Sequence, residues 1–259
     1  MKYQAVSGSN EIFPIERRQM ILALLRGEGK VVATELANRL KVSIDTVRRD
    51  LNQLAEEGSI QRVHGGGVPA SPALAPVVER QFRDHANKQI VAKKAAQLVQ
   101  NGAVIFLDSG TTAVEVAAAI DPEKEFTVIT HSPRAALVLA EQRTRAEIIL
   151  LGGRIDHHDL VAMSPSTISE IRKFRANLFL MGICSIHPAL GITCRSLEDL
   201  EVKRAMAEAS AEVAGLATAE KLGTAGPMVL GPVSILNQLV TDAPEEITRE
   251  YARSGVAII

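Results

Sequence analysis

The feature that most constrains this chain is the stretch 35–54, where two amphipathic helical patterns stand on either side of a tight turn. In both patterns apolar residues recur three or four positions apart, as they do on the buried face of a helix. The apolar positions of the second pattern are Ile44, Val47, Leu51 and Leu54. Ser43 stands immediately before this pattern, at the position of a helix cap. The stretch therefore predicts a helix-turn-helix, which indicates a role in transcription control.

The second helix of this motif carries polar and basic side chains away from its apolar positions. These are Thr46, Arg49 and Asn52, with Arg48 at the margin and Ser43 at the N-terminal end. Side chains of these types reach base edges and phosphates when a helix lies in the major groove of DNA. We therefore expect all five residues to contact DNA.

The flanking sequence extends the motif on both sides. Residues 16–25 form a further helical pattern, and three helices can close a small core. Residues 59–68 alternate in polarity and then turn at three glycines, as a β-hairpin does. Three helices and a hairpin make a winged helix-turn-helix, in which Arg62 and His64 are expected to touch the DNA backbone or minor groove. The alternative is a helical bundle whose arginines are only solvated.

The segments ERRQMILALL and TELANRLKVSIDTVRRDLNQLAEEGSIQRVHGGG closely resemble the N-terminal domain of DeoR-type bacterial transcriptional regulators. The resemblance implies a DNA-binding regulator, usually a repressor of sugar or carbohydrate metabolism genes. It also implies a C-terminal α/β sensor domain that resembles sugar-phosphate isomerases and binds a phosphorylated sugar or related metabolite, which relieves repression. Neither enzymatic activity nor a cofactor is expected. The alternative is an isomerase-like enzyme fused to a DNA-binding head, because a fold alone does not exclude catalysis.

The composition suits a chain with a large α/β domain. The 259 residues are 46% hydrophobic but only 3% aromatic, so aliphatic side chains must fill the core, as in a parallel sheet covered by helices. The formal net charge is −1, and residues 1–70 carry ten lysines and arginines against eight acidic residues. The DNA prediction therefore depends on where the arginines stand, because bulk charge says little.

Short apolar strand patterns alternate with helical patterns from residue 103 onward. Strands are predicted at 103–107, 127–129, 147–151, 177–181, 212–217 and 238–240, with 256–259 as a candidate for a further strand. Helices are predicted at 112–120, 132–142, 166–174, 197–209 and 245–253. This alternation predicts an α/β fold with a mainly parallel sheet, in which ligands bind at the carboxyl ends of the strands.

The expected domain boundary lies in residues 69–76, where three prolines and several small residues interrupt the periodicity. We therefore predict a winged helix-turn-helix DNA-binding domain over residues 14–70. A linker and connecting helix follow over 71–101, with the helix itself at about 77–100. An α/β effector-sensing domain then occupies 102–259.

The segment after the first predicted strand is a candidate phosphate site. It consists of Asp108, Ser109, Gly110, Thr111 and Thr112. Its hydroxyls and backbone N–H groups are able to hold a phosphate at the positive end of a helix, while Asp108 accepts hydrogens from sugar hydroxyls. The segment also matches the sensor of the DeoR family. The alternative is a capping box between Thr112 and Glu115, which needs no ligand.

Further candidates for the effector site stand after the other predicted strands. They are Thr130, His131, Ser132, Gly152 and Gly153. Ser132 before a proline is also an ordinary start of a helix. Lys203 and Lys221 match positions of the family's sensor, although Thr218 and Glu220 stand where the family commonly has Asp and Ser. Each lysine has the alternative of a solvated surface group.

The remaining patterns exclude several classes of function. Residues 156–159 (DHHD) have the residue types of a metal site, but adjacent histidines in a loop rarely converge on one ion, so we predict no metal site. No signal-peptide pattern is visible, nor an apolar run of about 18 residues, which predicts a cytoplasmic protein without membrane contact. The expected partners are double-stranded operator DNA, the phosphorylated sugar, and further copies of the chain in a dimer or tetramer.

Overall fold

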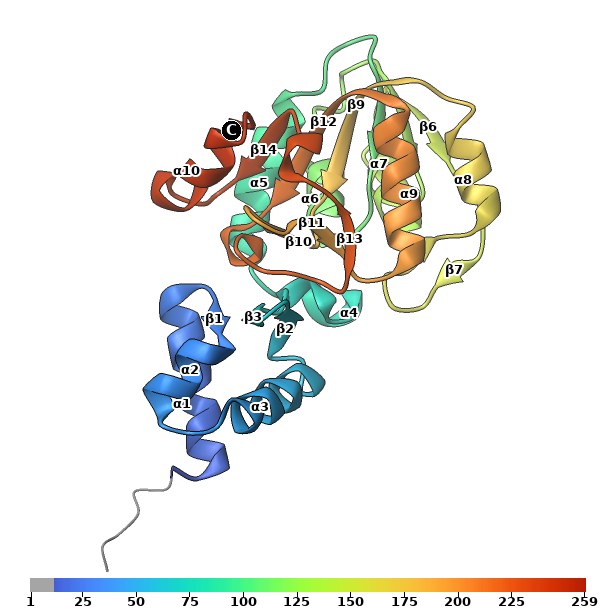
Figure 1. The fold of residues 1–259 in the computed structure, drawn as a ribbon. Helices are drawn as coiled ribbons and strands as arrows, with labels where there is room; N and C mark the ends of the chain where they lie inside the picture. Colours follow the sequence, from blue (N-terminus) through green and yellow to red (C-terminus); the bar gives the residue numbers. More distant parts are fainter. Residues whose placement is uncertain (1–11) are drawn as a thin grey trace, which may run out of the picture. The chain divides into compact units, whose positions relative to one another are not determined.

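The computed structural model describes residues 12–259, and the chain divides into two compact units between Ala70 and Ser71. Figure 1 shows an N-terminal unit of helices with a small sheet and a C-terminal unit built around a larger sheet. Residues 71–101, predicted as a linker and connecting helix, lie within the C-terminal unit. Among the described residues, no helix has the length and apolar character required to cross a membrane.

The N-terminal unit is a winged helix-turn-helix. Its elements are α1 (Pro14–Glu28), β1 (Val31–Val32), α2 (Ala33–Leu40), α3 (Ile44–Glu56), β2 (Ile60–Val63) and β3 (Gly66–Pro69). The strands form an antiparallel sheet in the order β1-β3-β2. Val47, Leu51 and Leu54 of α3 are buried against Ile21 of α1 and Leu36 of α2, which confirms the predicted apolar faces.

The hairpin of this unit turns at His64 and Gly65, one position earlier than the run of three glycines suggested, and Gly65 has φ 77°. The other two glycines lie in β3. A Cβ on Gly66 would stand 1.9 Å from the carbonyl oxygen of Val31. Glycine at position 66 therefore allows β1, a strand that the sequence did not predict, to pair with β3.

The C-terminal unit is organised by a seven-stranded parallel sheet in the order β15-β14-β12-β9-β4-β5-β6. In chain order its strands are β4 (Val104–Leu107), β5 (Thr127–Thr130), β6 (Glu147–Leu150), β9 (Ala176–Gly182), β12 (Ser210–Ala217), β14 (Gln238–Thr241) and β15 (Ala257–Ile258). All seven strands predicted from the sequence are present, which confirms the parallel α/β prediction.

Helices cover both faces of this sheet (Figure 1). One face packs against α5 (His85–Gln97), α6 (Thr111–Ala119) and α7 (Pro133–Glu141). The other packs against α8 (Pro165–Ile171), α9 (Leu197–Glu208) and α10 (Glu245–Arg253). Phe106 of β4 and Phe179 of β9 meet edge to face on this second side, with ring centroids 6.4 Å apart. Aliphatic side chains supply most of the two cores, as the composition predicted.

The C-terminal unit differs from the sequence-based expectation in three places. The helix predicted at 77–100 is divided into α4 (Val77–Arg80) and α5, because the chain turns at Asp84, whose φ is 51°. An antiparallel sheet, not predicted, is formed by β10 (Ser185–His187), β11 (Gly191–Cys194) and β13 (Met228–Gly231), and a small hairpin by β7 (Ile155–Asp156) and β8 (Val161–Ala162). Three short 3₁₀ helices complete the unit: η1 (Pro72–Leu74), η2 (Ala219–Lys221) and η3 (Val233–Ile235).

Candidate functional site

The first candidate site is the exposed side of α3. Ser43 caps this helix, as predicted: its Oγ accepts a hydrogen bond from the backbone N–H of Thr46 (3.1 Å) and lies 2.9 Å from the Thr46 hydroxyl. Arg48, Arg49 and Asn52 are exposed. The cap satisfies one of the free N–H groups at the start of the helix. It therefore determines the residue at which α3 begins, and with it the position of these side chains on the helix.

The arginines of α3 make only weak contacts within the unit. Arg48 lies 3.3 Å from an exposed carboxylate oxygen of Asp45, and Arg49 Nε donates a long bond of 3.4 Å to the Asp45 carbonyl. Exposed ion pairs of this kind contribute little to stability. Both guanidinium groups can therefore exchange these partners for phosphate or base oxygens without a large loss of free energy.

A buried ion pair, which the sequence analysis missed, fixes α3 to α1. Arg17 donates through Nε and Nη2 to the two carboxylate oxygens of Asp50, the second bond measuring 3.1 Å, and both side chains are buried. The hydrogen bond to Asp50 raises the pKa of Arg17. An acidic residue among the buried positions of an amphipathic helix was the available signal, because a buried carboxylate requires a cation.

The predicted contacts of the wing differ in exposure. His64 is exposed at the hairpin turn, whereas Arg62 on β2 is half-buried. His64 is therefore the more accessible of the two side chains that the sequence assigned to the wing.

The second candidate site is a pocket in the C-terminal unit, beside the carboxyl ends of β4 and β9. Six predicted residues line it: Ser109, Gly110, Thr111, Thr112, Lys203 and Lys221. Four charged residues that sequence analysis did not assign to the effector site also line it: Arg80, Asp159, Arg195 and Asp199. Because these four come from three separate segments, no local pattern marks them as neighbours.

The N-terminus of α6 forms one wall of this pocket. Gly110 is the N-cap with φ 91°, and Thr111 and Thr112 are the first helical residues, both buried. The capping box between Thr112 and Glu115 is therefore wrong, because Thr112 lies inside the helix, and Glu115 instead lies 3.3 Å from His85. Thr112 Oγ1 is buried without a hydrogen-bond partner. A buried polar atom without a partner is costly, which favours a ligand or water in this position.

Asp108 lies behind the pocket and does not line it. Its Oδ2 accepts hydrogen bonds from Lys203 Nζ (2.7 Å) and the backbone N–H of Gly182 (2.8 Å), and its side chain is fully buried. Lys203 also lies 2.8 Å from Asp199 Oδ1. Burial opposes the charge on Lys203, but the two carboxylates outweigh it and raise its pKa well above the usual value. Asp108 thus holds a structural cation through Oδ2, whereas its buried Oδ1 has no hydrogen-bond partner among the described residues, and Asp108 does not line the pocket.

The predicted residues after β5 also lie outside the pocket lining. Ser132 caps α7 by accepting from the Ala135 N–H (3.3 Å), and Thr130 Oγ1 accepts from the Ser132 N–H (3.1 Å). His131 is fully buried, and its Nε2 lies 3.6 Å from Asp108 Oδ1. Burial lowers the pKa of His131. Of these three residues, His131 lies next to Asp108 behind the pocket, and Thr130 and Ser132 lie where β5 leads into α7.

Gly152 and Gly153 are structural as well, since they approach the start of α8 and not the pocket. The Gly152 carbonyl accepts from Thr167 Oγ1 (2.8 Å). A Cβ on Gly153 would stand 2.4 Å from the same oxygen. The two glycines thus permit a close approach, but to a helix of the same unit and not to the pocket.

Lys221 differs from every other cation in the pocket. Its side chain is buried, and Nζ donates to the carbonyl of Ile183 (2.8 Å). Among the described residues no carboxylate forms an ion pair with it, whereas Lys203, Arg80 and Arg195 each have one. Burial, reinforced by the charge of Arg80, lowers the pKa of Lys221 to about 8. An anion in the pocket would complete the environment of this ammonium.

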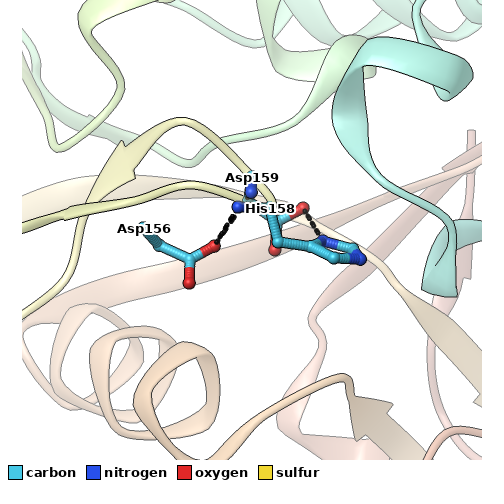
Figure 2. A group of neighbouring side chains, drawn as sticks. All are labelled: Asp156, His158 and Asp159. Atoms are coloured by element: carbon cyan, nitrogen blue, oxygen red, sulfur yellow. Dashed lines mark hydrogen bonds and ion pairs between the residues drawn. The ribbon is translucent and has the colours of Figure 1, made fainter.

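The candidate metal residues form an ion-pair network instead. Figure 2 shows Asp156, His158 and Asp159 grouped in the β7–β8 hairpin. Their potential ligand atoms lie within 4.8 Å of one another. Asp159 bridges two guanidinium groups, at 2.5 Å from Arg80 Nη2 and 2.9 Å from Arg195 Nε, and Arg195 Nη2 lies 3.1 Å from Asp156. Because both carboxylates are already neutralised by arginine, this geometry does not favour a metal ion.

The two units together define a class of protein: a winged helix-turn-helix joined to an α/β domain with a cation-lined pocket. The family described as the DeoR C terminal sensor domain matches residues 83–243, more than half of the chain, and the DeoR-like helix-turn-helix domain matches residues 17–72. The chain therefore belongs to the DeoR family and is a DNA-binding transcriptional regulator.

Relatives match over nearly the whole chain. The glycerol-3-phosphate regulon repressor of Haemophilus influenzae is 33% identical over 233 residues, covering 89% of this chain and 91% of that protein. The repressor of the same name from Escherichia coli is 30% identical over 234 residues, covering 90% and 92%. These relatives are named as repressors and not as enzymes.

Similar solved structures are more distant. The full-length sorbitol operon regulator SorC from Klebsiella pneumoniae has a TM-score of 0.44 and 13% identity, covering 93% of this chain and 100% of that chain. Ribose 5-phosphate isomerase A from Methanocaldococcus jannaschii has a TM-score of 0.40 and 19% identity, covering 54% and 55%. Neither likeness is high enough to indicate a function.

Proposed function

We propose that the protein represses genes of sugar or carbohydrate metabolism and releases its operator when a phosphorylated sugar occupies the sensor pocket. The observation that carries the sensor part is the combination of Lys221 with the hydroxyl of Thr112: within residues 12–259, the buried cation has no carboxylate partner and the hydroxyl has no hydrogen-bond partner. Both line the same pocket, beside the positive end of α6. Helix N-termini and buried cations are established features of phosphate sites.

The charges of the pocket favour a single phosphate group. Lys203 lies between Asp108 and Asp199, and Arg80 and Arg195 share Asp159. Lys221 remains as the cation that needs a counter-ion. The remaining polar surface, formed by Ser109, Asp159 and Asp199, suits the hydroxyl groups of a small polyol.

On the DNA side, we propose that α3 enters the major groove with Thr46, Arg48, Arg49 and Asn52, while Ser43 fixes the start of the helix. Arg62 and His64 then contact the backbone or minor groove from the wing. A dimer or tetramer in the cytoplasm would place two such helices about 34 Å apart on successive turns of the operator.

The DNA part is tested by selecting bound duplexes from random-sequence DNA and measuring the affinity of the selected operator. Arg49→Ala should weaken binding by about 1–3 kcal/mol if the arginine contacts a guanine, and less, with a shallower salt dependence, if it contacts phosphate. Arg204→Ala, which removes an exposed arginine of α9 paired with Glu201, is the matched control and should bind as wild type. Unchanged affinity in Arg49→Ala would remove this residue from the interface.

The sensor part is tested by thermal shift with inorganic phosphate, glycerol 3-phosphate and hexose phosphates, each beside its unphosphorylated counterpart. Glycerol 3-phosphate is the first organic probe because two relatives are named for its regulon. We expect stabilisation by phosphorylated compounds only, and binding without conversion of the sugar. Turnover of a sugar phosphate would favour the isomerase-like alternative, and no stabilisation by any phosphate would contradict the proposal.

A further inference from the structure

The segment 71–84, here called the strap, follows the DNA-binding unit directly in the chain, yet it is fixed to the sensor at several points. Ser71 donates through N to the carbonyl of Ala225 (3.3 Å) and through Oγ to that of Cys184 (2.5 Å). Val77 N donates to the carbonyl of His158 (2.9 Å), and Ser71, Ala73 and Val77 are buried. The strap is therefore a packed part of the sensor and not a free linker.

The strap also forms a wall of the pocket, through Ala73 and Arg80. Two of the Arg80 nitrogens bond to fixed groups: Nε donates to the Ala75 carbonyl (2.7 Å) and Nη2 to Asp159 (2.5 Å). The third, Nη1, lies 3.9 Å from the position that a Cβ on Gly110 would take. Arg80 thus extends from the strap to the N-terminus of α6, where the proposed function places the phosphate.

Lys88 fixes the far end of the strap. Its buried ammonium donates to the carbonyls of Arg80 (2.7 Å) and Arg83. The strap is thereby held at one end by the carbonyls of Cys184 and Ala225 and at the other by Lys88 of α5, with Arg80 between them. Movement of the first residues of the strap would displace the point at which the DNA-binding unit is attached.

We propose that the strap is the element that couples the pocket to DNA binding: an anion bound jointly by Arg80 of the strap and by Lys221 and α6 of the sensor body stabilises the docked strap. This inference rests on the proposed function, because it assigns a mechanism of regulation to the same site. A ligand that contacts both parts binds the docked state more tightly than the released one, and this difference in affinity shifts the equilibrium between them.

The test uses the full-length protein with inorganic phosphate as the probe and amide hydrogen exchange of residues 71–84 as the measurement. If the released strap does not bind phosphate, amide hydrogen exchange that requires release of the strap should slow by about tenfold at a phosphate concentration ten times the dissociation constant. In Arg80→Ala, phosphate should bind about tenfold more weakly, and saturation with phosphate should leave strap exchange unchanged. Arg80→Gln repeats the test with a longer polar side chain, should the alanine variant fold poorly.

Arg83→Ala is the matched control, because Arg83 lies in the same strap, is exposed and makes no side-chain hydrogen bond in the structure. It should retain the wild-type affinity for phosphate and the wild-type protection of the strap. In parallel, saturating phosphate should change the operator affinity of wild type and Arg83→Ala but not that of Arg80→Ala.

The outcomes separate the two claims. Phosphate binding to wild type without protection of 71–84, or retained protection and coupling in both Arg80 variants, would overturn the role of the strap and leave the proposed sensor intact. Absence of inorganic phosphate binding to wild type would overturn this inference, and absence of binding by every phosphorylated compound in the thermal-shift test would overturn the proposed function as well.

Discussion

Replacing Lys221 by methionine should stabilise the sensor while removing its ability to bind phosphate. The pKa of Lys221 falls from 10.5 to about 8 on folding, mainly through burial, and this difference corresponds to about 3 kcal/mol of destabilisation while the group is charged. Methionine removes that charge but also removes the hydrogen bond to the Ile183 carbonyl, a loss of about 1 kcal/mol. We therefore expect the free energy of unfolding of Lys221→Met to exceed that of wild type by about 2 kcal/mol at pH 7.

The sign of the pH dependence follows from the same lowered pKa. Between pH 8 and 10.5 the unfolded chain still binds a proton at Lys221, and the folded chain does not, so stability rises with pH in this window. Between pH 7 and 9.5 the free energy of unfolding of wild type should rise by about 2 kcal/mol because of Lys221. In Lys221→Met this contribution should be absent. The advantage of the variant should therefore disappear near pH 9.5.

Urea unfolding followed by tyrosine fluorescence measures the stability of the sensor alone. The chain contains no tryptophan and two tyrosines, so a Tyr3→Phe background leaves Tyr251, buried in α10, as the only reporter. Scans should stop at pH 9.5, because the raised pKa of Tyr251, about 12, adds its own pH dependence above that. Lys94→Met is the control, since Lys94 also donates to a backbone carbonyl (Thr241, 2.8 Å) but is only half-buried.

Two results would refute this reasoning. One is a Lys221→Met variant less stable than wild type at pH 7, and the other is a stability difference that stays constant from pH 7 to 9.5. Either would mean that the ammonium of Lys221 is not a destabilising buried charge awaiting an anion.

Three further changes test the two units. Arg17→Ala leaves Asp50 buried without its cation and should destabilise the DNA-binding unit by about 3 kcal/mol, measured by circular dichroism during urea unfolding. Asp50→Asn leaves Arg17 without its carboxylate and should destabilise the unit as well. Thr112→Val should leave stability unchanged or slightly higher, because the lost hydroxyl has no partner, but should weaken phosphate binding in calorimetry; undiminished affinity would exclude this hydroxyl from the site. Gly66→Ala should separate β1 from β3 and lower operator affinity in gel-shift titrations, while Gly27→Ala, where a Cβ meets open space on α1, should perturb the sheet much less.

Much of the fold was predictable because it depends on near neighbours in the chain. The spacing of Val47, Leu51 and Leu54 determines the buried side of α3, and Ser43 caps it through a residue three positions away. The strands of the parallel sheet were predicted for the same reason, as short apolar runs between helical patterns. Gly110 also marked the turn into α6 correctly, whereas Gly66 and Gly67, expected in the hairpin turn, lie in β3.

Local sequence patterns were therefore enough to predict the two kinds of unit, the exposed face of α3 and a pocket near the carboxyl ends of the strands. Which charges in that pocket are available depends on contacts between distant segments. These contacts place Lys203 against Asp108, 95 residues away, and give Lys221 a carbonyl but no carboxylate from the part of the chain that the structure describes. Burial and the partner of a charge arise from segments far apart in sequence, and these two quantities decide whether a cation is structural or free to bind an anion.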